Sequence, residues 1–133
     1  MVEVELSKII IDEKRQEQVI VLKERFGGRL LPIVVGIMEA AAIRMPLAGM
    51  NPPRPLTHDL IKIIVDTLEG EIDRVVIDKL RQGTFYAKII IGAYGKMKAV
   101  DARPSDSIAL ALRTKSPIFV EEEVLDKTGE TQV

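Results

Sequence analysis

The chain has 133 residues, of which 47% are hydrophobic and 29% are charged, a length and balance typical of one globular domain. It contains no cysteine, which excludes a disulfide scaffold, a thiolate metal site and a cysteine nucleophile. The start of the chain lacks the basic residues of a signal peptide, and no apolar stretch reaches the roughly 18 residues that cross a bilayer. We therefore expect a cytoplasmic protein with no membrane contact.

Charge is distributed unevenly along the chain. Residues 121–133 hold five acidic residues and one lysine, whereas the preceding 120 residues hold 18 basic and 15 acidic ones. A mildly basic body permits contacts with phosphate groups without requiring them. We expect one compact domain over residues 1–125, followed by a frayed acidic tail over residues 126–133.

The first half of the chain predicts strands followed by a helix. β-Branched residues separated by polar or glycine turns predict strands over residues 2–11, 18–23 and 30–35. At Gly36 the pattern becomes helical, and Glu39 and Arg44 are the polar residues in an otherwise apolar stretch. We expect this helix to be largely buried and to end near Pro46.

The second half alternates helices with strands. A helix is expected from Thr57, whose hydroxyl can cap it, to Leu68, and another from Pro104 to Lys115. Further strands are predicted over residues 71–80, 84–92, 96–101 and 117–120. Because helices and strands do not alternate strictly, we predict an α+β fold with a mixed, largely antiparallel sheet and about three helices.

Two predicted helix starts resemble each other. Each consists of an arginine, a proline, a hydroxyl residue and an acid in the first turn. The residues concerned are Arg54, Thr57 and Asp59 in the first segment and Arg103, Ser105 and Asp106 in the second. Free backbone N–H groups at a helix start favour an anion, and arginine presents a planar fork suited to phosphate. From residue types alone, the more ordinary explanation of the same residues is a helix cap with a fixed ion pair.

Three more polar residues are candidates for a site. His58 is the only histidine, and at a helix start its neutral form is favoured, which suits a base or a polar contact. Glu39 on an apolar helix either pairs with an arginine, such as Arg54 or Arg103, or faces a cleft. Asp101 ends a predicted strand, a common position for a site residue.

Carboxylates also raise the question of a metal. Glu39, Asp59, Asp101 and Asp106 offer oxygen ligands suited to Mg²⁺ or Mn²⁺ if the fold gathers them. The chain has no glycine-rich phosphate loop before a helix, so no organic cofactor is expected.

Several ordered motifs resemble one known family. They are LPIVVG (31–36) with Glu39 and Ala40, RPLTHDL (54–60), TFYA (84–87), DARPSDSIALA (101–111) and PIFV (117–120). Together they are similar to the bifunctional nuclease domain over roughly residues 3–125, and the chain resembles a bacterial or archaeal single-domain member.

The resemblance implies an α+β domain that forms homo-oligomers and a nuclease that acts on DNA and RNA. Carried onto this chain, its polar positions imply catalytic roles for one group and phosphate binding for another. The implied catalytic residues are Glu39, His58, Asp59, Asp101 and Asp106, and the implied phosphate-binding residues are Arg54, Arg103, Thr57 and Ser105.

Three functional hypotheses follow. The first is a phosphodiesterase that depends on a divalent metal ion. The second is a non-catalytic oligomeric binding module, in which the two helix starts form a structural ion-pair network. The third is a sensor for a small anion or a phosphate-bearing metabolite.

Overall fold

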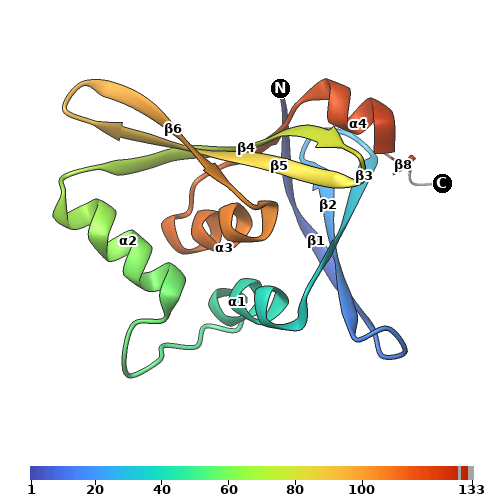
Figure 1. Cartoon of the computed structure of the whole chain (residues 1–133), viewed down its shortest axis with the longest axis horizontal. Coiled ribbons are helices and arrows are strands. Elements are labelled where there is room, and N and C mark those ends of the chain that lie inside the picture. Colours follow the sequence, from blue (N-terminus) through green and yellow to red (C-terminus); the bar gives the residue numbers. More distant parts are fainter. Residues whose placement is uncertain (129, 132–133) are drawn as a thin grey trace.

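One mixed sheet organises the computed structural model, which describes residues 1–128 and 130–131 (Figure 1). Its strands lie in the order β6–β5–β4–β7–β1–β2–β3–β8. All neighbours are antiparallel except β4 and β7. The strands are β1 (Val2–Asp12), β2 (Glu17–Glu24), β3 (Arg29–Val35), β4 (Glu71–Arg81), β5 (Thr84–Ala93), β6 (Lys96–Ala102), β7 (Ile118–Val120) and β8 (Glu130–Thr131). The predicted α+β class with a largely antiparallel sheet is confirmed.

Two three-stranded meanders make up most of this sheet. The turn between β4 and β5 is Gln82–Gly83 and that between β5 and β6 is Tyr94–Gly95, and all four residues have positive φ. Two consecutive residues with positive φ are typical of the tight hairpin turn whose twist matches that of antiparallel strands. The short strand β7 lies between the meanders, antiparallel to β1 and parallel to β4.

Three helices cover one side of the sheet around a central helix, α3 (Figure 1). They are α1 (Ile37–Leu47), α2 (Thr57–Thr67) and α3 (Pro104–Thr114). Seven residues of α3 are buried, and α1 and α2 both pack against it. No helix in the described part of the chain has the length and hydropathy that a bilayer crossing requires.

The expectation that α1 is largely buried is wrong. Only Ala40 and Ile43 of this helix are buried, whereas Ile37, Met38 and Leu47 are exposed. The helix contacts α3 along one side, and its composition is too uniformly apolar to show which side that is.

A fourth helix, α4 (Glu122–Thr128), begins inside the acidic segment. Val124 and Leu125 of this helix are buried in the core, and Arg29 of β3 makes an ion pair of 2.5 Å with Glu122. Part of the segment expected to be a frayed tail is therefore a packed helix, and β8 adds a short strand beside β3. Residues 129, 132 and 133 of the expected tail lie outside the described residues.

Candidate functional site

The start of α3 gathers charge around one carboxylate. Arg103 precedes the helix as its N-cap residue, and Pro104 occupies the first turn as predicted. The Arg103 guanidinium forks onto Asp106, with 2.9 Å from Nε to Oδ2 and 3.2 Å from Nη2 to Oδ1. Such a bidentate contact fixes the plane of both groups. The Asp106 hydrogen bond in turn raises the pKa of Arg103.

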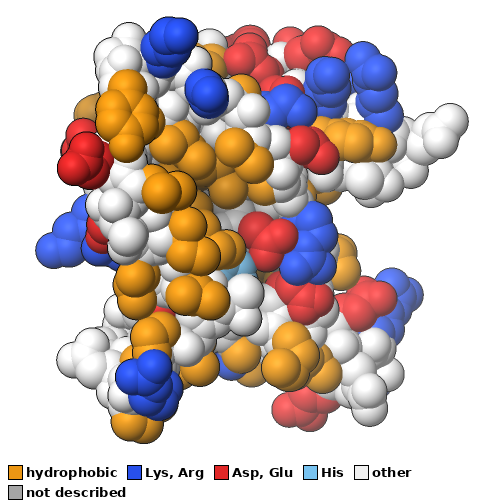
Figure 2. Space-filling view, turned by 60° about the vertical axis from the view of Figure 1, so that its left-hand side comes forward, with side chains coloured by type: hydrophobic (Ala, Val, Ile, Leu, Met, Phe, Trp, Pro, Cys, Tyr) orange, Lys and Arg blue, Asp and Glu red, His pale blue; other side chains and the backbone are white. Residues whose placement is uncertain are grey.

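His58 joins this carboxylate from another helix. It lies in the first turn of α2, and its Nε2 is 2.9 Å from Asp106 Oδ1. The His58 side chain is 13% exposed. In Figure 2 the single histidine, in pale blue, is visible in a recess between apolar side chains and a group of acidic and basic ones. Residues 48 positions apart thus meet at one point.

The environment keeps Asp106 ionised. Burial of the Asp106 carboxyl raises its pKa, but hydrogen bonds from Arg103 and His58 lower the pKa by more. The net result is a pKa below the ordinary aspartate value, because both partners favour the charged form. A carboxylate that stays charged can hold a histidine in one orientation and one tautomer.

Glu39 completes the cluster from α1. Its Oε1 lies 3.9 Å from Arg103 Nη1, so the expected pairing of Glu39 with an arginine is confirmed. The Glu39 carboxylate also folds back over Gly36, where an added Cβ atom would lie 2.7 Å from Oε1. Glycine at position 36 therefore leaves the space that this carboxylate occupies at the start of its helix.

A surface hollow of about 320 Å³ opens beside these charges. Glu39, Arg103 and Ser105 line it, together with the β4–β5 turn at Gly83 and Thr84. The Arg103 side chain is 65% exposed, so its guanidinium remains accessible from solvent despite its contacts with Asp106. The hollow can admit an anion to an arginine that two carboxylates hold in place.

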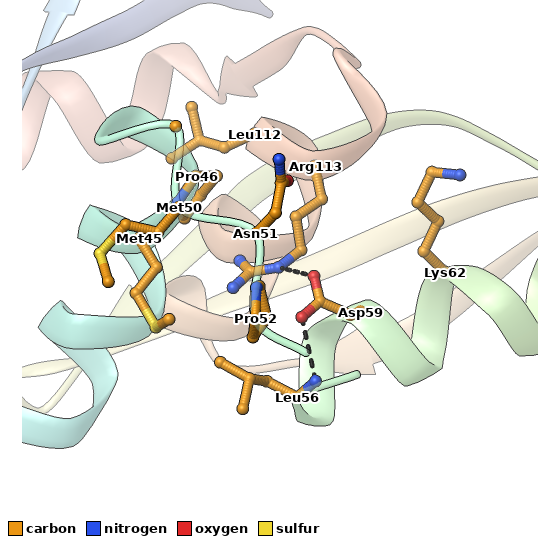
Figure 3. A pocket seen from close by; sticks show the side chains of 11 residues that line it. Met45, Pro46, Met50, Asn51, Pro52, Leu56, Asp59, Lys62, Leu112 and Arg113 are labelled. Carbon is orange, nitrogen blue, oxygen red and sulfur yellow. Dashed lines mark hydrogen bonds and ion pairs between the residues drawn. The ribbon is translucent and has the colours of Figure 1, made fainter. Parts of the chain in front are cut away.

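A second connection between α2 and α3 involves the last turn of α3 (Figure 3). Arg113, whose side chain is 7% exposed, donates from Nε to Asp59 Oδ1 over 2.8 Å. Its Nη1 donates to the carbonyl oxygens of Ala42 and Ala109 over 2.8 and 2.9 Å. Burial raises the pKa of Asp59, but hydrogen bonds from the Leu56 N–H and Arg113 lower it below its usual value.

Arg113 was not among the residues that the sequence indicated. It is a basic residue in the last turn of a helix, a position that ordinarily reads as solvated complementation of the helix dipole. Arg113 is buried because α1 and α2 pack against α3. The spacing of residues in the sequence does not show this packing.

The prediction that the Thr57 hydroxyl caps α2 is wrong. Leu56, not Thr57, is the N-cap residue, and Thr57 makes no capping hydrogen bond. The Asp59 carboxylate accepts from the Leu56 N–H over 3.0 Å instead. An acid at the third helical position satisfies the N–H of the N-cap residue, a different donor from the one that bonds to a capping hydroxyl.

The remaining predicted residues lie apart from the cluster. Asp101 is exposed on β6 and makes a 3.3 Å ion pair with Lys88 of β5. Arg54 is exposed and forms no ion pair with any described residue, and Thr57 is exposed as well. Ser105 is buried at the wall of the hollow.

These positions do not form a metal site in this arrangement. Among residues 1–128 and 130–131, no group of three or more histidine or acidic side chains is placed to hold an ion. Glu39 and Asp106 both pair with the Arg103 guanidinium, which occupies the place of a bridging cation. The residues present therefore do not fit Mg²⁺ or Mn²⁺ in this arrangement.

Comparison with known proteins shows the family of this chain. The chain is 45% identical over 129 residues to an uncharacterised protein of Mycobacterium tuberculosis, a match that covers 97% of this chain and 77% of that protein. It is 32% identical over 105 residues to bifunctional nuclease 1 of Arabidopsis thaliana, covering 76% of this chain and 32% of the plant protein. It is 29% identical over 123 residues to bifunctional nuclease 2 of rice, covering 90% and 38%. Residues 20–132 match the family described as the bifunctional nuclease domain, and the chain belongs to that family.

Proposed function

We propose that the chain is a nuclease that cleaves phosphodiester bonds in DNA and RNA, and that the reaction takes place at the cluster of Glu39, Arg103, Asp106 and His58. One observation carries this proposal: helices α2 and α3 bring a histidine, an aspartate and an exposed arginine together, and the arginine lines a hollow. The names of the plant relatives support the activity class, although the chain spans only about a third of their length.

Arg103 is the phosphate-binding group in this proposal. Asp106 holds it through Nε and Nη2, whereas the 3.9 Å separation from Glu39 leaves Nη1 free to donate elsewhere. A guanidinium fixed in this way can contact the phosphate oxygens as negative charge grows on them in the transition state. Glu39 acts as a positioning residue, since it touches Arg103 rather than the substrate.

His58 is the general base. Asp106 accepts from its Nε2–H, so the neutral ring presents Nδ1 as an acceptor, and Nδ1 makes no hydrogen bond with any described residue. Nδ1 takes a proton from a water molecule that attacks the phosphorus atom. The ester P–O bond breaks as the new P–O bond forms, the leaving oxygen takes up a proton from solvent, and the protonated His58 then returns its proton to solvent.

The other predicted roles stay predictions. Asp59 and Asp101 pair outside the cluster, so the proposal assigns them no step as catalytic groups. Phosphate contacts from Arg54, Thr57 and Ser105 would extend the binding surface along the start of α2 and the hollow. Dependence on Mg²⁺ or Mn²⁺ also stays a prediction, and cleavage with and without EDTA tests it. A cytoplasmic location is a further prediction, separate from the mechanism.

Cleavage of fluorescent single-stranded DNA and RNA tests the proposal. We expect His58→Gln and Asp106→Asn each to lower the cleavage rate by about 10²- to 10⁴-fold, the usual contribution of a positioned base. Asp66→Asn, which removes an exposed acid from the same helix, is the matched control and should retain the wild-type rate. If the repurified double variant His58→Gln/Asp106→Asn cleaves as fast as the wild type, the assignment is wrong.

Self-association is the second part of the proposal. Helix α2 has no buried residue, although five large apolar side chains at or beside it are exposed. These are Leu56, Leu60, Ile63, Ile64 and Leu68, called here the α2 face. An exposed apolar patch of this kind marks a protein interface. The α2 face carries no charge of its own, so a second copy of the chain can cover it without burying a charge, as in apolar homodimer interfaces.

A further inference from the structure

A second cavity is lined by Asp59 and Arg113 together with apolar side chains, and the proposed reaction does not use it. Its volume is about 290 Å³, at the lower end of the roughly 300–1,000 Å³ of small-molecule pockets. The walls are formed by the end of α1, the segment that follows it, the first half of α2 and the end of α3 (Figure 3). The apolar lining consists of Met45, Pro46, Met50, Pro52, Leu56 and Leu112.

The polar end of this cavity is the Arg113 guanidinium. An arginine has five N–H donors, and here Nε donates to Asp59 while Nη1 donates to two backbone carbonyls. The two N–H groups of Nη2 have no acceptor among the described residues. Nη2 is not fully buried, and Arg113 lines the cavity. A bound molecule can therefore reach these two N–H groups.

The charges around this cavity largely cancel. Asp59 lies 2.8 Å from Arg113, and Lys62 at the rim lies 2.8 Å from Asp66. An anion would therefore find no unbalanced positive charge, whereas a neutral acceptor oxygen gains an N–H donor without a change in charge. The lining favours a ring in addition, because flexible methionine thioethers make favourable contacts with aromatic rings.

We propose that this cavity binds a neutral heterocyclic ring whose carbonyl oxygen accepts from Arg113 Nη2, and that the ring is a nucleobase. The preference for a neutral acceptor ring follows from the cavity alone, whereas the choice of a nucleobase rests on the proposed nuclease function. Asp106 and Arg113 are seven residues apart on α3, roughly 10 Å along the helix axis, so a base in the cavity would lie close to the proposed cleavage site.

Methyl NMR of the methionines tests this inference without any cleavage. Met45 and Met50 line the cavity, whereas Met38 and Met97 do not, so the chain contains its own probes and controls. Titration with guanosine or uridine should shift the Met45 and Met50 signals in a saturable manner and leave Met38 and Met97 unchanged. Benzamide and benzoate serve as a neutral and an anionic ring for comparison.

A cavity-filling variant provides the second arm, because Arg113 variants risk unfolding. Met50→Trp replaces an exposed side chain at the cavity and should weaken nucleoside binding at least tenfold, whereas Met38→Trp on the exposed side of α1 should not. Shifts with benzoate alone, shifts with benzamide but not nucleosides, or nucleoside binding that Met50→Trp leaves intact would each overturn the inference. Because nucleosides carry no phosphodiester bond, nucleoside binding with no DNA or RNA cleavage would count against the proposed function alone.

Discussion

Two consecutive residues of α2 connect it to α3, and the two connections differ in the exposure of the arginine that each one contains. His58 meets Asp106 beside a hollow, where the shared partner Arg103 is 65% exposed. Asp59 meets Arg113, whose side chain is 7% exposed and also donates to carbonyls of α1 and α3. Exposed ion pairs contribute little to stability, whereas loss of one partner from a buried pair costs several kcal/mol. The first connection is therefore expected to serve chemistry and the second to hold the helices together.

The largest expected effect is on activity at the first connection. Arg103→Met should lower kcat/KM for DNA and RNA cleavage by about 10²- to 10³-fold, because a charge that stabilises the transition state is lost. Its free energy of unfolding should stay within about 1 kcal/mol of the wild type, since the side chain is largely exposed. Cleavage kinetics and urea denaturation of the same preparation check both parts.

Arg54→Met is the matching variant at the other Arg-Pro helix start, and it tests whether Arg54 and Arg103 have different roles. Arg54 is exposed and touches no described carboxylate, so as a phosphate contact it should weaken nucleic-acid binding and reduce the salt dependence of log K by about one. An equal loss of kcat/KM in both variants would show that the fixed geometry of Arg103 is irrelevant.

The second largest effect is on stability at the buried connection. Arg113→Met should lower the free energy of unfolding by about 3 kcal/mol, because Asp59 and the carbonyls of Ala42 and Ala109 lose their donor together. Urea denaturation measures the loss, and Arg113→Lys should recover only part of it, since an ammonium lacks the planar fork. If Arg113→Met changes the free energy of unfolding by less than about 1 kcal/mol, the Asp59–Arg113 connection does not hold the helices together as proposed.

The outward side of α2 offers a third test, with a smaller energetic effect. Ile63→Glu places a charge on the apolar α2 face and should raise the dissociation constant of the homo-oligomer at least tenfold, about 1.4 kcal/mol. Light scattering after size exclusion, over a range of protein concentrations, gives the mass. Lys62→Glu, on the same helix but outside that face, is the control. A monomeric wild type would refute the proposed self-association.

The last effect is of similar size and concerns pH. The lowered pKa of Asp59 means that its contacts stabilise the fold above the unfolded pKa of about 3.9 and stop doing so as pH falls through the folded pKa. Asp59→Asn should therefore be less stable than the wild type by about 1.5 kcal/mol near neutral pH. The gap in unfolding free energy should be constant above pH 5 and close below about pH 4. If the difference in unfolding free energy persists in acid, the charge of Asp59 is not the source of its contribution to stability.

Local patterns were enough to predict most elements, because strands and hairpin turns follow from alternation and from glycine positions. The tertiary arrangement of polar groups was not predictable in the same way. Pairing of Glu39 with an arginine followed from the cost of burying a charge, whereas the buried state of Arg113 depends on how three helices meet. Helix α4 was missed because its acids suggested a solvated tail, and two buried residues, Val124 and Leu125, outweighed them.

The place of β7 has a consequence for how the chain is made. This strand has three residues and joins the two meanders, yet it comes from residues 118–120, after both have been synthesised. Until it emerges from the ribosome, β1 and β4 each expose an unpaired backbone edge, and such edges pair readily with other chains. Translation that pauses before residue 118 should therefore leave a nascent chain that depends on chaperones, and release of β7 from the ribosome should end the dependence.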